Sequence, residues 1–352
     1  NGEYSSYSLE PKINAGYNNT QNFNFQSKIA LHIKFPFLEG LKLTSQVAYD
    51  RATFRNKSFS VPSTYSTFDS SSNEFSLSTP STRGETASLS ESQSQGYKLV
   101  TEAILSYDRI IEKHEFGAKF IYSKTLTQDN YLSAGISNLL GTSVDFFIAG
   151  DAETRTNSNG TSETGILGYA GRFSYSYNNK YLLEFNGRYD GSYKFSKDAR
   201  FGFFPSFSAA WRVSEENFLN KSSVINNLKI RASYGELGSD VGIGGFRYLE
   251  FFGFGSPFVD NSGVSQSIGS SGLADANTTW EKAKTYNIGM ELGLWNNLFT
   301  LETDFYYKRT SDILTTRALQ VPDTFGAILP AENIGVVDNK GIEIIINHKN
   351  KI

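Results

Sequence analysis

The residues with the most obvious capacity for chemistry are three histidines and a pair of acids two positions apart. His32, His114 and His348 are widely separated in the sequence, whereas zinc binding or a catalytic triad needs such groups to converge. Glu302 and Asp304 would share one face of an extended segment at about 6.6–7 Å. That separation suits paired carboxylates, but we favour the plainer interpretation of a polar wall in contact with water.

Two glycine motifs also carry little chemistry. The run Gly242-Ile243-Gly244-Gly245 lacks the Lys-Ser/Thr of a phosphate-binding loop and no helix is expected after it. Asp190-Gly191 offers a single acid, whereas a calcium site needs several oxygen ligands. We predict that Asp190-Gly191 is a hairpin turn, because glycine accepts a positive φ. No catalytic, metal-binding or cofactor-binding residue is therefore predicted, and an enzyme is not expected.

The composition limits the class of protein. The chain has 352 residues, no cysteine and a net charge of −3, which excludes disulfides and thiolate metal sites. The mild acidity gives no hint of nucleic-acid binding, which requires a basic stripe. Aromatic residues reach 14%, yet no apolar run is long enough for a transmembrane helix. The chain starts at Asn1 without a signal-like segment, so we expect either a removed signal or an internal piece of a longer protein.

A two-residue alternation runs through nearly every segment. In Tyr181–Tyr189 one face is aromatic and apolar, while the other carries Glu184, Asn186 and Arg188. The pattern recurs near residues 41–50, 99–107, 115–122, 172–178, 228–234, 286–294, 299–308 and 342–347. This periodicity predicts an all-β protein of about 11 or 12 strands.

The connectors alternate between short and long. Short ones lie near residues 36–40, 109–113, 178–180 and 296–297, and long ones lie near 52–96, 124–165, 236–279 and 310–340. Connections in compact soluble domains are mostly about 4–6 residues. Tight turns at one rim and long loops at the other are typical of an antiparallel up-and-down transmembrane β-barrel. We therefore expect residues 1–352 to be part of one such domain, with the long loops extracellular.

The candidate site residues follow from this arrangement. Nine polar residues of both signs are predicted to face the lumen: Glu184, Asn186, Arg188, Lys229, Arg231, Glu291, Glu302, Asp304 and Lys308. A mixed wall suits contact with a plug or with a passing polar solute. The Gly-aromatic loop near 239–273 offers Phe246, Tyr248, Phe251 and Phe252 as candidate ligand contacts. Their rings could stack on a sugar or an apolar peptide side chain, or could pack the loop onto its neighbours.

Residues 66–95 are polar, and we expect them to be mobile.

Several motifs, in order along the chain, together resemble one family. They are Tyr181–Phe195 followed by Ala199–Arg212, EENFL at 215–219, LKIRASYGELG at 228–238, TTWEKAKTYNIG at 278–289 and PAENIGVVDNKGIE at 330–343. They resemble the SusC/RagA family of TonB-dependent outer-membrane transporters, in which R-x-DGS-x-x-F precedes an FPS-x-S-x-x-WR strand. This chain departs at Tyr193, where the family often has serine. The match is strong from about residue 165 to 348 and looser before it.

The resemblance implies a 22-stranded barrel with a plugged lumen, preceded by a plug domain and a TonB-contacting segment that are not expected in this chain. It also implies import of oligosaccharides or peptides across the bacterial outer membrane, with a SusD-like surface lipoprotein, TonB and outer-membrane lipid as partners. Neither a cofactor nor nucleic acid is expected. Two alternatives stay open: a barrel enzyme of protease or lipase type, and a surface adhesive β-domain.

Overall fold

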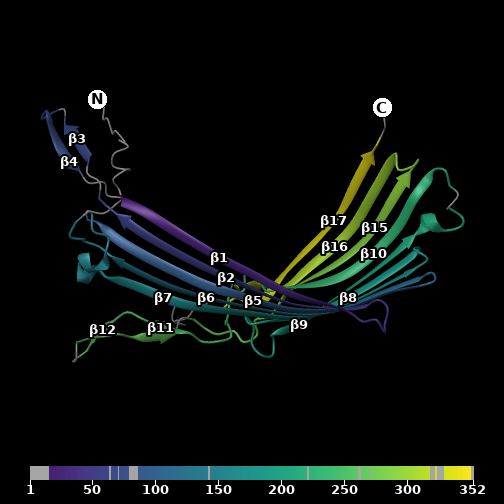
Figure 1. The fold of residues 1–352 in the computed structure, drawn as a ribbon, viewed down its shortest axis with the longest axis horizontal. Helices are drawn as coiled ribbons and strands as arrows, with labels where there is room; N and C mark the ends of the chain where they lie inside the picture. The colour runs from purple at the N-terminus through teal and green to yellow at the C-terminus, as the bar shows by residue number, and fades with distance from the viewer. Residues whose placement is uncertain are drawn as a thin grey trace. The chain divides into compact units, whose positions relative to one another are not determined.

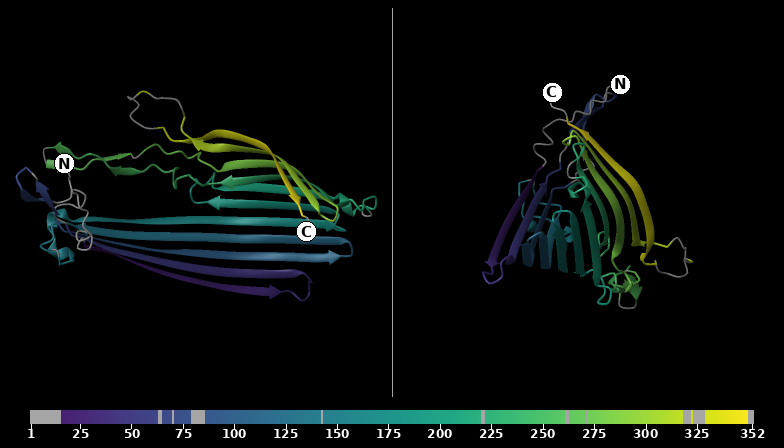
Figure 2. Two further views of the ribbon diagram at one scale, coloured as in Figure 1. Left: turned by 90° about the horizontal axis from the view of Figure 1, so that it is seen from above. Right: turned by 90° about the vertical axis from the view of Figure 1, so that its right-hand side faces the viewer.

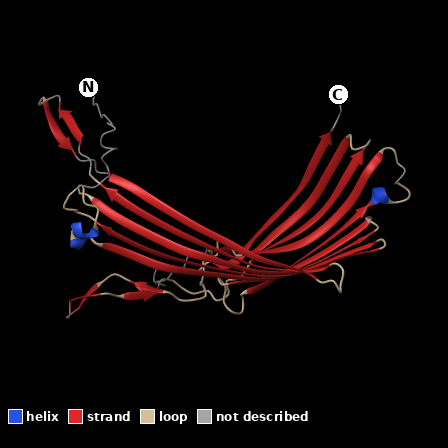
Figure 3. Ribbon diagram, viewed as in Figure 1, coloured by secondary structure: helices blue, strands red, loops and turns tan. Residues whose placement is uncertain are grey.

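The computed structural model describes residues 16–62, 65–69, 71–78, 86–141, 143–219, 222–260, 263–270, 272–317, 322 and 329–349. Its main sheet has eleven strands in the hydrogen-bonded order β1-β2-β5-β6-β7-β8-β9-β10-β15-β16-β17 (Figure 1). Each strand therefore pairs with the next long strand along the chain, which is the up-and-down antiparallel arrangement. Helical structure in the described residues consists of three short 3-10 turns (Figure 3). The prediction of an all-β antiparallel fold is confirmed.

The eleven strands of the main sheet are long. They are β1 (Gly16–Lys34), β2 (Leu41–Ser60), β5 (Ser88–Ile111), β6 (His114–Ile136), β7 (Thr156–Tyr177), β8 (Tyr181–Ser192), β9 (Phe201–Arg212), β10 (Ile225–Ser239), β15 (Glu281–Leu294), β16 (Phe299–Thr315) and β17 (Glu332–His348). The 3-10 turns are η1 (Phe147–Ala149), η2 (Ala152–Thr154) and η3 (Val213–Glu215). Figure 2 shows the long strands side by side, in chain order, from two further directions.

Short strands pair with one another inside the long connections. They are β3 (Tyr65–Asp69) with β4 (Glu74–Ser78), β11 (Phe252–Phe254) with β14 (Ile268–Ser270), and β12 (Phe258–Asp260) with β13 (Gly263–Ser265). The alternation in the sequence predicted none of these pairs, because three to five residues are too few to show a period.

The chain forms two compact units. The first comprises the described parts of Asn1–Lys28, Ala48–Leu99 and Leu126–Thr164, and its core contains Phe59, Ala87, Leu89 and Ile136. The second comprises Ile29–Val47, Val100–Thr125 and the described parts of Gly165–Ile352. The core of the second unit contains Phe195, Phe204, Ile243 and Trp280. The candidate site lies entirely within the second unit.

Tight turns join successive strands where the sequence predicted short connectors. Between β7 and β8 the turn contains Asn178 and Asn179, both left-handed with φ of 51° and 54°. Between β15 and β16 it contains Asn296 and Asn297, with φ of 58° and 60°. Asparagine tolerates this conformation better than most residues, because its short side chain hydrogen-bonds locally. These turns fix which residues of neighbouring strands face one another.

The strands extend further than the sequence predicted, which corrects the loop boundaries. The connection predicted near 52–96 is shorter, because β2 continues to Ser60 and β5 begins at Ser88. The one predicted near 124–165 lies between Ile136 and Thr156. Residues 66–95, expected to be mobile, include β4, most of β3 and the start of β5. In these extensions apolar side chains are sparse and keep no regular two-residue alternation, so apolar periodicity does not mark them, whereas backbone pairing continues regardless of side-chain type.

The hairpin turn predicted at Asp190-Gly191 is wrong. Both residues pair with β7 on one side and with β9 on the other, and the turn comes after Ser192. Glycine is needed here for space: a Cβ on Gly191 would lie 2.5 Å from a ring atom of Phe201. The Asp190 carboxylate accepts hydrogen bonds from the Arg188 guanidinium at 2.9 and 3.0 Å. Asp-Gly is therefore a strand dipeptide that accommodates a neighbouring ring.

Several of the motifs quoted above meet in the core of the second unit. Phe195 is fully buried, and the centre of its ring lies 5.0 Å from that of Trp280. The ring centre of Phe204 lies 5.4 Å from that of Trp280. The indole nitrogen of Trp280 donates to the carbonyl of Arg200 at 3.2 Å. Burying an aromatic ring stabilises by about 2–3 kcal/mol, so this cluster holds the β8–β9 turn against the start of β15.

Polar contacts secure the same region. The hydroxyl of Ser192, also fully buried, donates to the Asp240 carboxylate at 2.7 Å, and the Lys194 ammonium donates to the Asp240 carbonyl at 2.6 Å. The amide of Asn333 exchanges two hydrogen bonds with the Thr279 backbone at 2.9 and 3.0 Å. Both ends of the long connection from β10 to β15 are therefore fixed.

Candidate functional site

The strand register places all nine predicted lumen residues on one face of the sheet, which we call the polar face. Residues opposite one another on paired strands share a face. Lys229 on β10 is opposite Glu291 on β15, which is opposite Glu302 on β16. Applied to every strand pair from β8 to β16, this rule places the following residues on the polar face: Glu184, Asn186, Arg188, Lys229, Arg231, Glu291, Glu302, Asp304 and Lys308. That this face lines a lumen stays a prediction.

Five of the nine form one ionic network, which we call the Arg231 cluster: Lys229, Arg231, Glu291, Glu302 and Asp304. The Arg231 guanidinium contacts Glu302 at 2.7 Å and Asp304 at 2.6 Å through one nitrogen. Its Nε lies 3.4 Å from Glu291, which also accepts from Lys229 at 3.1 Å. The cluster joins three strands, and its two bases and three acids leave one negative charge in excess.

Gly289 makes the centre of this cluster possible. It lies on β15, between Arg231 on β10 and Asp304 on β16. A Cβ at Gly289 would lie 2.6 Å from Asp304 Oδ1 and 2.9 Å from Arg231 Nε. The missing side chain therefore opens a path across β15 for a direct ion pair. Gly289 was not among the predicted site residues, although a glycine in a strand interior is a known sign of a close approach.

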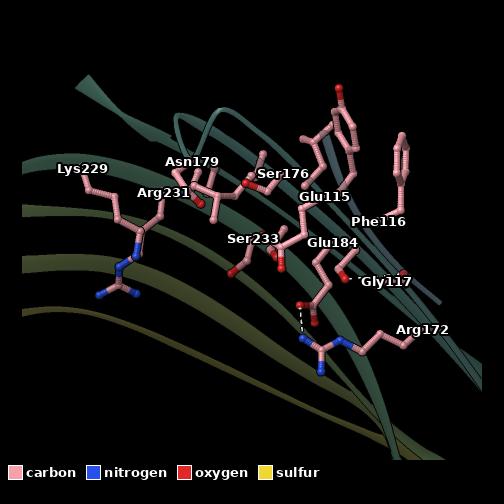
Figure 4. A pocket seen from close by; sticks show the side chains of 18 of the residues that line it. Glu115, Phe116, Gly117, Arg172, Ser176, Asn179, Glu184, Lys229, Arg231 and Ser233 are labelled. Atoms are coloured by element: carbon pink, nitrogen blue, oxygen red, sulfur yellow. Dashed lines mark hydrogen bonds and ion pairs between the residues drawn. The ribbon is translucent and has the colours of Figure 1, made fainter. Parts of the chain in front are cut away.

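A second group of charges lies on the polar face beside the cluster. Arg172 on β7 contacts Glu184 at 2.6 Å, and Asn186 donates to the other oxygen of Glu184 at 2.8 Å. Figure 4 shows the Arg172 and Glu184 side chains pointing toward one another. Arg172 was not among the predicted site residues, although it alternates with Phe173 in the same way that Glu184 alternates with Phe185.

A pocket of about 520 Å³ lies on the polar face and brings these groups together (Figure 4). Its lining comes from β5 to β10 and β15, and includes Glu115, Arg172, Glu184, Lys229 and Arg231. Between the charges the side chains of the polar face are small: Ser174, Ser176, Ser208, Ala210 and Ser233. Such a wall offers hydroxyls and charged groups for hydrogen bonding. Six of the nine predicted residues do not line this pocket: Asn186, Arg188, Glu291, Glu302, Asp304 and Lys308.

The opposite side of the sheet, which we call the apolar face, is rich in exposed aromatic and aliphatic side chains. Ile288, Phe305 and Ile342 lie opposite one another and are 60%, 55% and 62% exposed. The Tyr234 and Tyr286 rings lie 4.9 Å apart, with Tyr307 next in the row. Soluble monomers rarely expose a continuous apolar surface of this kind. It is instead typical of a wall that faces lipid.

At the short-turn end of the apolar face, the polar atoms of the Tyr181 and Trp211 rings are hydrogen-bonded. The Glu216 carboxylate accepts from the Tyr181 hydroxyl at 2.7 Å, from the Trp211 indole at 3.2 Å and from Lys180 at 3.1 Å. The hydrogen bond from Tyr181, with those from Lys180 and Trp211, lowers the pKa of Glu216.

The distance along β8 from Tyr181 to Tyr189 is about 26 Å at about 3.3 Å per residue. At the strand tilt of about 35–45° found in membrane barrels, this segment spans about 20 Å of the roughly 25 Å apolar band, which is bordered by aromatic residues.

The four predicted loop contacts separate into two pairs. The Phe246 ring packs edge-on against Tyr193 at 5.6 Å and lies 6.2 Å from Tyr248. Phe251 and Phe252 are 51% and 66% exposed. The structure therefore gives Phe246 a packing role, and contact of any of the four with a ligand stays a prediction.

The three histidines lie on separate strands, β1, β6 and β17. His32 contacts Thr44 at 3.1 Å, and His114 contacts the Tyr175 hydroxyl at 2.8 Å. No group of three or more metal-ligating side chains occurs among the described residues. No helix in the described part of the chain is long and apolar enough to cross a membrane.

A sheet with one polar face and one apolar face bordered by aromatic rings defines the wall of a transmembrane β-barrel. The chain belongs to the family described as TonB dependent receptor-like, beta-barrel, whose model matches residues 1–349. Members of this family are integral proteins of the outer membrane.

Curated relatives support this assignment. TonB-dependent receptor P3 of Formosa agariphila is 32% identical over 252 residues, which are 71% of this chain and 25% of that protein. TonB-dependent receptor SusC of Bacteroides thetaiotaomicron is 35% identical over 206 residues, which are 56% of this chain and 20% of SusC. The aligned part of the chain thus spans about a quarter of these relatives or less.

Solved structures support the fold. The RagAB peptide importer in its closed-closed state superposes with a TM-score of 0.77 at 20% sequence identity, covering 95% of this chain and 35% of that chain. Its open-open state gives the same TM-score, identity and coverage. The wall described above is therefore the fold of part of a known importer barrel.

Proposed function

We propose that this chain forms part of the barrel wall of an outer-membrane importer for oligosaccharides or peptides. In this proposal TonB supplies the energy, and a SusD-like surface lipoprotein captures the substrate. The observation that carries the proposal is the opposition of the two faces in the second unit. The polar face holds the Arg231 cluster and the pocket, while the apolar face presents exposed rings. The similarity to the RagAB peptide importer supports the peptide class, and the resemblance of the sequence motifs to the SusC/RagA family supports the oligosaccharide class.

The polar face serves this function as a hydrogen-bonding surface rather than as an ion filter. Arg231 and Lys229 are paired with acids, so the wall presents no strong field of one sign. A polar, neutral solute such as a sugar or a peptide backbone exchanges hydrogen bonds with such a wall at little electrostatic penalty. We propose that the polar face contacts the plug when the barrel is closed, and the solute when it passes.

The long-loop residues give a second place of contact. Phe251 and Phe252 expose their rings, and a flat aromatic face stacks on a sugar ring or on an apolar peptide side chain. The loop rings therefore suit both cargo classes, and the choice between them is a matter for measurement. Because Phe246 is packed against Tyr193, we assign the direct contact to Phe251 and Phe252.

Uptake by intact cells tests the proposal. Cells expressing the full-length protein would receive labelled oligosaccharides or labelled peptides, with and without a proton uncoupler. We expect accumulation of one cargo class that the uncoupler abolishes, and that the Phe251→Ala, Phe252→Ala double variant lowers severalfold. Phe246→Leu, which keeps an apolar side chain against Tyr193, serves as the control. Uptake of neither class, or uptake unaffected by the uncoupler, would contradict the proposal.

A further inference from the structure

A shallow groove runs across the apolar face over β9, β10 and β15 to β17. Its volume is about 850 Å³, within the range of small-molecule sites. Two successive rows of cross-strand partners line it. One row is Phe207, Tyr234, Tyr286, Tyr307 and Lys340, and the next is Ala209, Ala232, Ile288, Phe305 and Ile342. The two alanines are the reason for the hollow, since small side chains lie between much larger ones.

A row of charged residues follows the tyrosines on the same face, toward the long connections. Glu236, Lys284, Arg309 and Asp338 lie opposite one another across four strands. Lys284 lies 3.4 Å from Glu236 and Arg309 lies 3.7 Å from Asp338, so each ion pair is loose. Lys340, at the end of the tyrosine row, is exposed and forms no ion pair with any described residue. With three bases and two acids, this edge of the groove carries one positive charge in excess.

The two acids of this row are also engaged from the tyrosine side. The Tyr307 hydroxyl donates to Asp338 at 3.0 Å, and the Tyr234 hydroxyl donates to Glu236. Arg309 has five N–H donors and its ion pair to Asp338 is longer than a hydrogen bond. Arg309 and Lys340 therefore keep donors free for a group that lies against the edge of the groove.

We propose that this surface binds a single membrane lipid whose phosphate-bearing headgroup has a net negative charge. An acyl chain lies in the groove over Ala209 and Ala232, between the tyrosine rings and the aliphatic row. The headgroup phosphate accepts hydrogen bonds from Arg309 and Lys340, with Lys284 nearby. Two features argue for a lipid: the groove lies within the apolar face, and the positive edge begins directly beyond the tyrosine rings. A guanidinium and an ammonium are the groups that bind phosphate most strongly.

Lipid retention by the purified full-length protein tests this site without any transport assay. The protein in mild detergent would be exposed to phosphatidylglycerol or to phosphatidylcholine with identical acyl chains, and bound lipid would be counted by native mass spectrometry. The anionic lipid is expected to be retained preferentially. An Arg309→Ala, Lys340→Ala double variant should lose this preference by at least about fivefold, because each basic residue near a membrane surface contributes about that factor.

Lys308→Ala is the matched control, since Lys308 neighbours Arg309 on β16, is exposed, and points to the polar face. It should retain the anionic lipid as the unaltered protein does. Equal loss in Lys308→Ala and in the double variant, or equal retention of both lipids, would overturn the proposal.

Ala232→Trp, which fills the groove, should reduce retention of both lipids. Unchanged retention in that variant would show that no acyl chain occupies the groove. Dimerisation in place of lipid binding would also overturn the assignment.

Discussion

At the scale of single residues, the polar face depends on a side chain that is missing. Arg231 and Asp304 lie on strands that do not pair with each other, and β15 separates them. Their ion pair at 2.6 Å crosses β15 at Gly289. Asp304 is only 8% exposed, so its charge needs that partner: an unpaired carboxylate in a buried position is strongly destabilising.

Gly289→Val should therefore destabilise the protein. The new side chain would overlap Asp304 Oδ1 and Arg231 Nε, and we expect the free energy of unfolding to fall by about 1–3 kcal/mol. Urea unfolding in detergent micelles measures this. Gly171→Val is the control, because nothing lies within 4 Å of a Cβ at Gly171. Equal effects of the two substitutions would show that strand conformation, and not the ion pair, explains why glycine occupies position 289.

Glu216 gives a pH-dependent prediction at the same scale. Its pKa is lowered, chiefly by the hydrogen bond from Tyr181. The folded state therefore favours the carboxylate, and the resulting stability is fully present above the ordinary glutamate pKa. It is lost as the pH falls through the lowered value. Glu216→Gln should lower the unfolding temperature at pH 7, and the difference from the unaltered protein should shrink in acid.

Glu215→Gln is the matched control for this prediction. Glu215 is adjacent in sequence, but it makes only a long contact of 3.9 Å with Arg212. Its substitution should leave the unfolding temperature nearly unchanged at both pH values. A difference for Glu216→Gln that persists equally at low pH would contradict the assignment to the ionised carboxylate.

At the scale of elements, the long connection from β10 to β15 is fixed at both ends and exposed in between. Its ends contain Ile243 and Trp280, which are buried, whereas Phe254 and Val259 are 82% and 80% exposed. The connection therefore holds its rings in place through its ends. This explains why the motif residues Phe195 and Trp280, far apart in sequence, belong to one structural unit.

Trp280→Ala should release this connection. Removing the ring leaves Phe195 and Phe204 without their shared partner, and such large-to-small changes cost about 3–5 kcal/mol. Limited proteolysis should then cut the connection from β10 to β15 faster than in the unaltered protein. Phe254→Ala, in the exposed part of the same connection, should not change the cleavage rate. Equal rates for all three proteins would exclude the packing role of Trp280.

The sequence predicted the elements better than their ends. Alternation is strong where one face is apolar, so the central part of β8 could be predicted residue by residue. It weakens where apolar side chains are sparse, and the extended ends of β2 and β5, whose large apolar residues are only Phe54, Phe59 and Leu89, were therefore missed. Asp190-Gly191 was misassigned because its glycine accommodates the ring of Phe201, a contact between strands that no local pattern encodes. Arg172 and Gly289 were missed for a similar reason, since their roles depend on partners from other strands.

At the scale of the whole molecule, the two faces of the sheet require two different environments. The aligned part of the chain spans 25% of one curated relative and 20% of another, so transport by the whole protein stays a proposal. The environment of each face of the sheet can be tested directly. The apolar face must meet lipid, and the polar face must meet water or a polar neighbour, with a change of environment at every successive residue of β8.

Single-cysteine labelling along β8 tests that claim most directly, because this chain contains no cysteine of its own. Cysteine would replace Leu183, Glu184, Phe185 or Asn186, one at a time, in the full-length protein in native outer membranes. A small, charged maleimide that reacts only in water would then be applied. We predict labelling at positions 184 and 186, and protection at positions 183 and 185 until detergent strips the lipid. Equal labelling at all four positions before detergent is added would contradict the membrane wall.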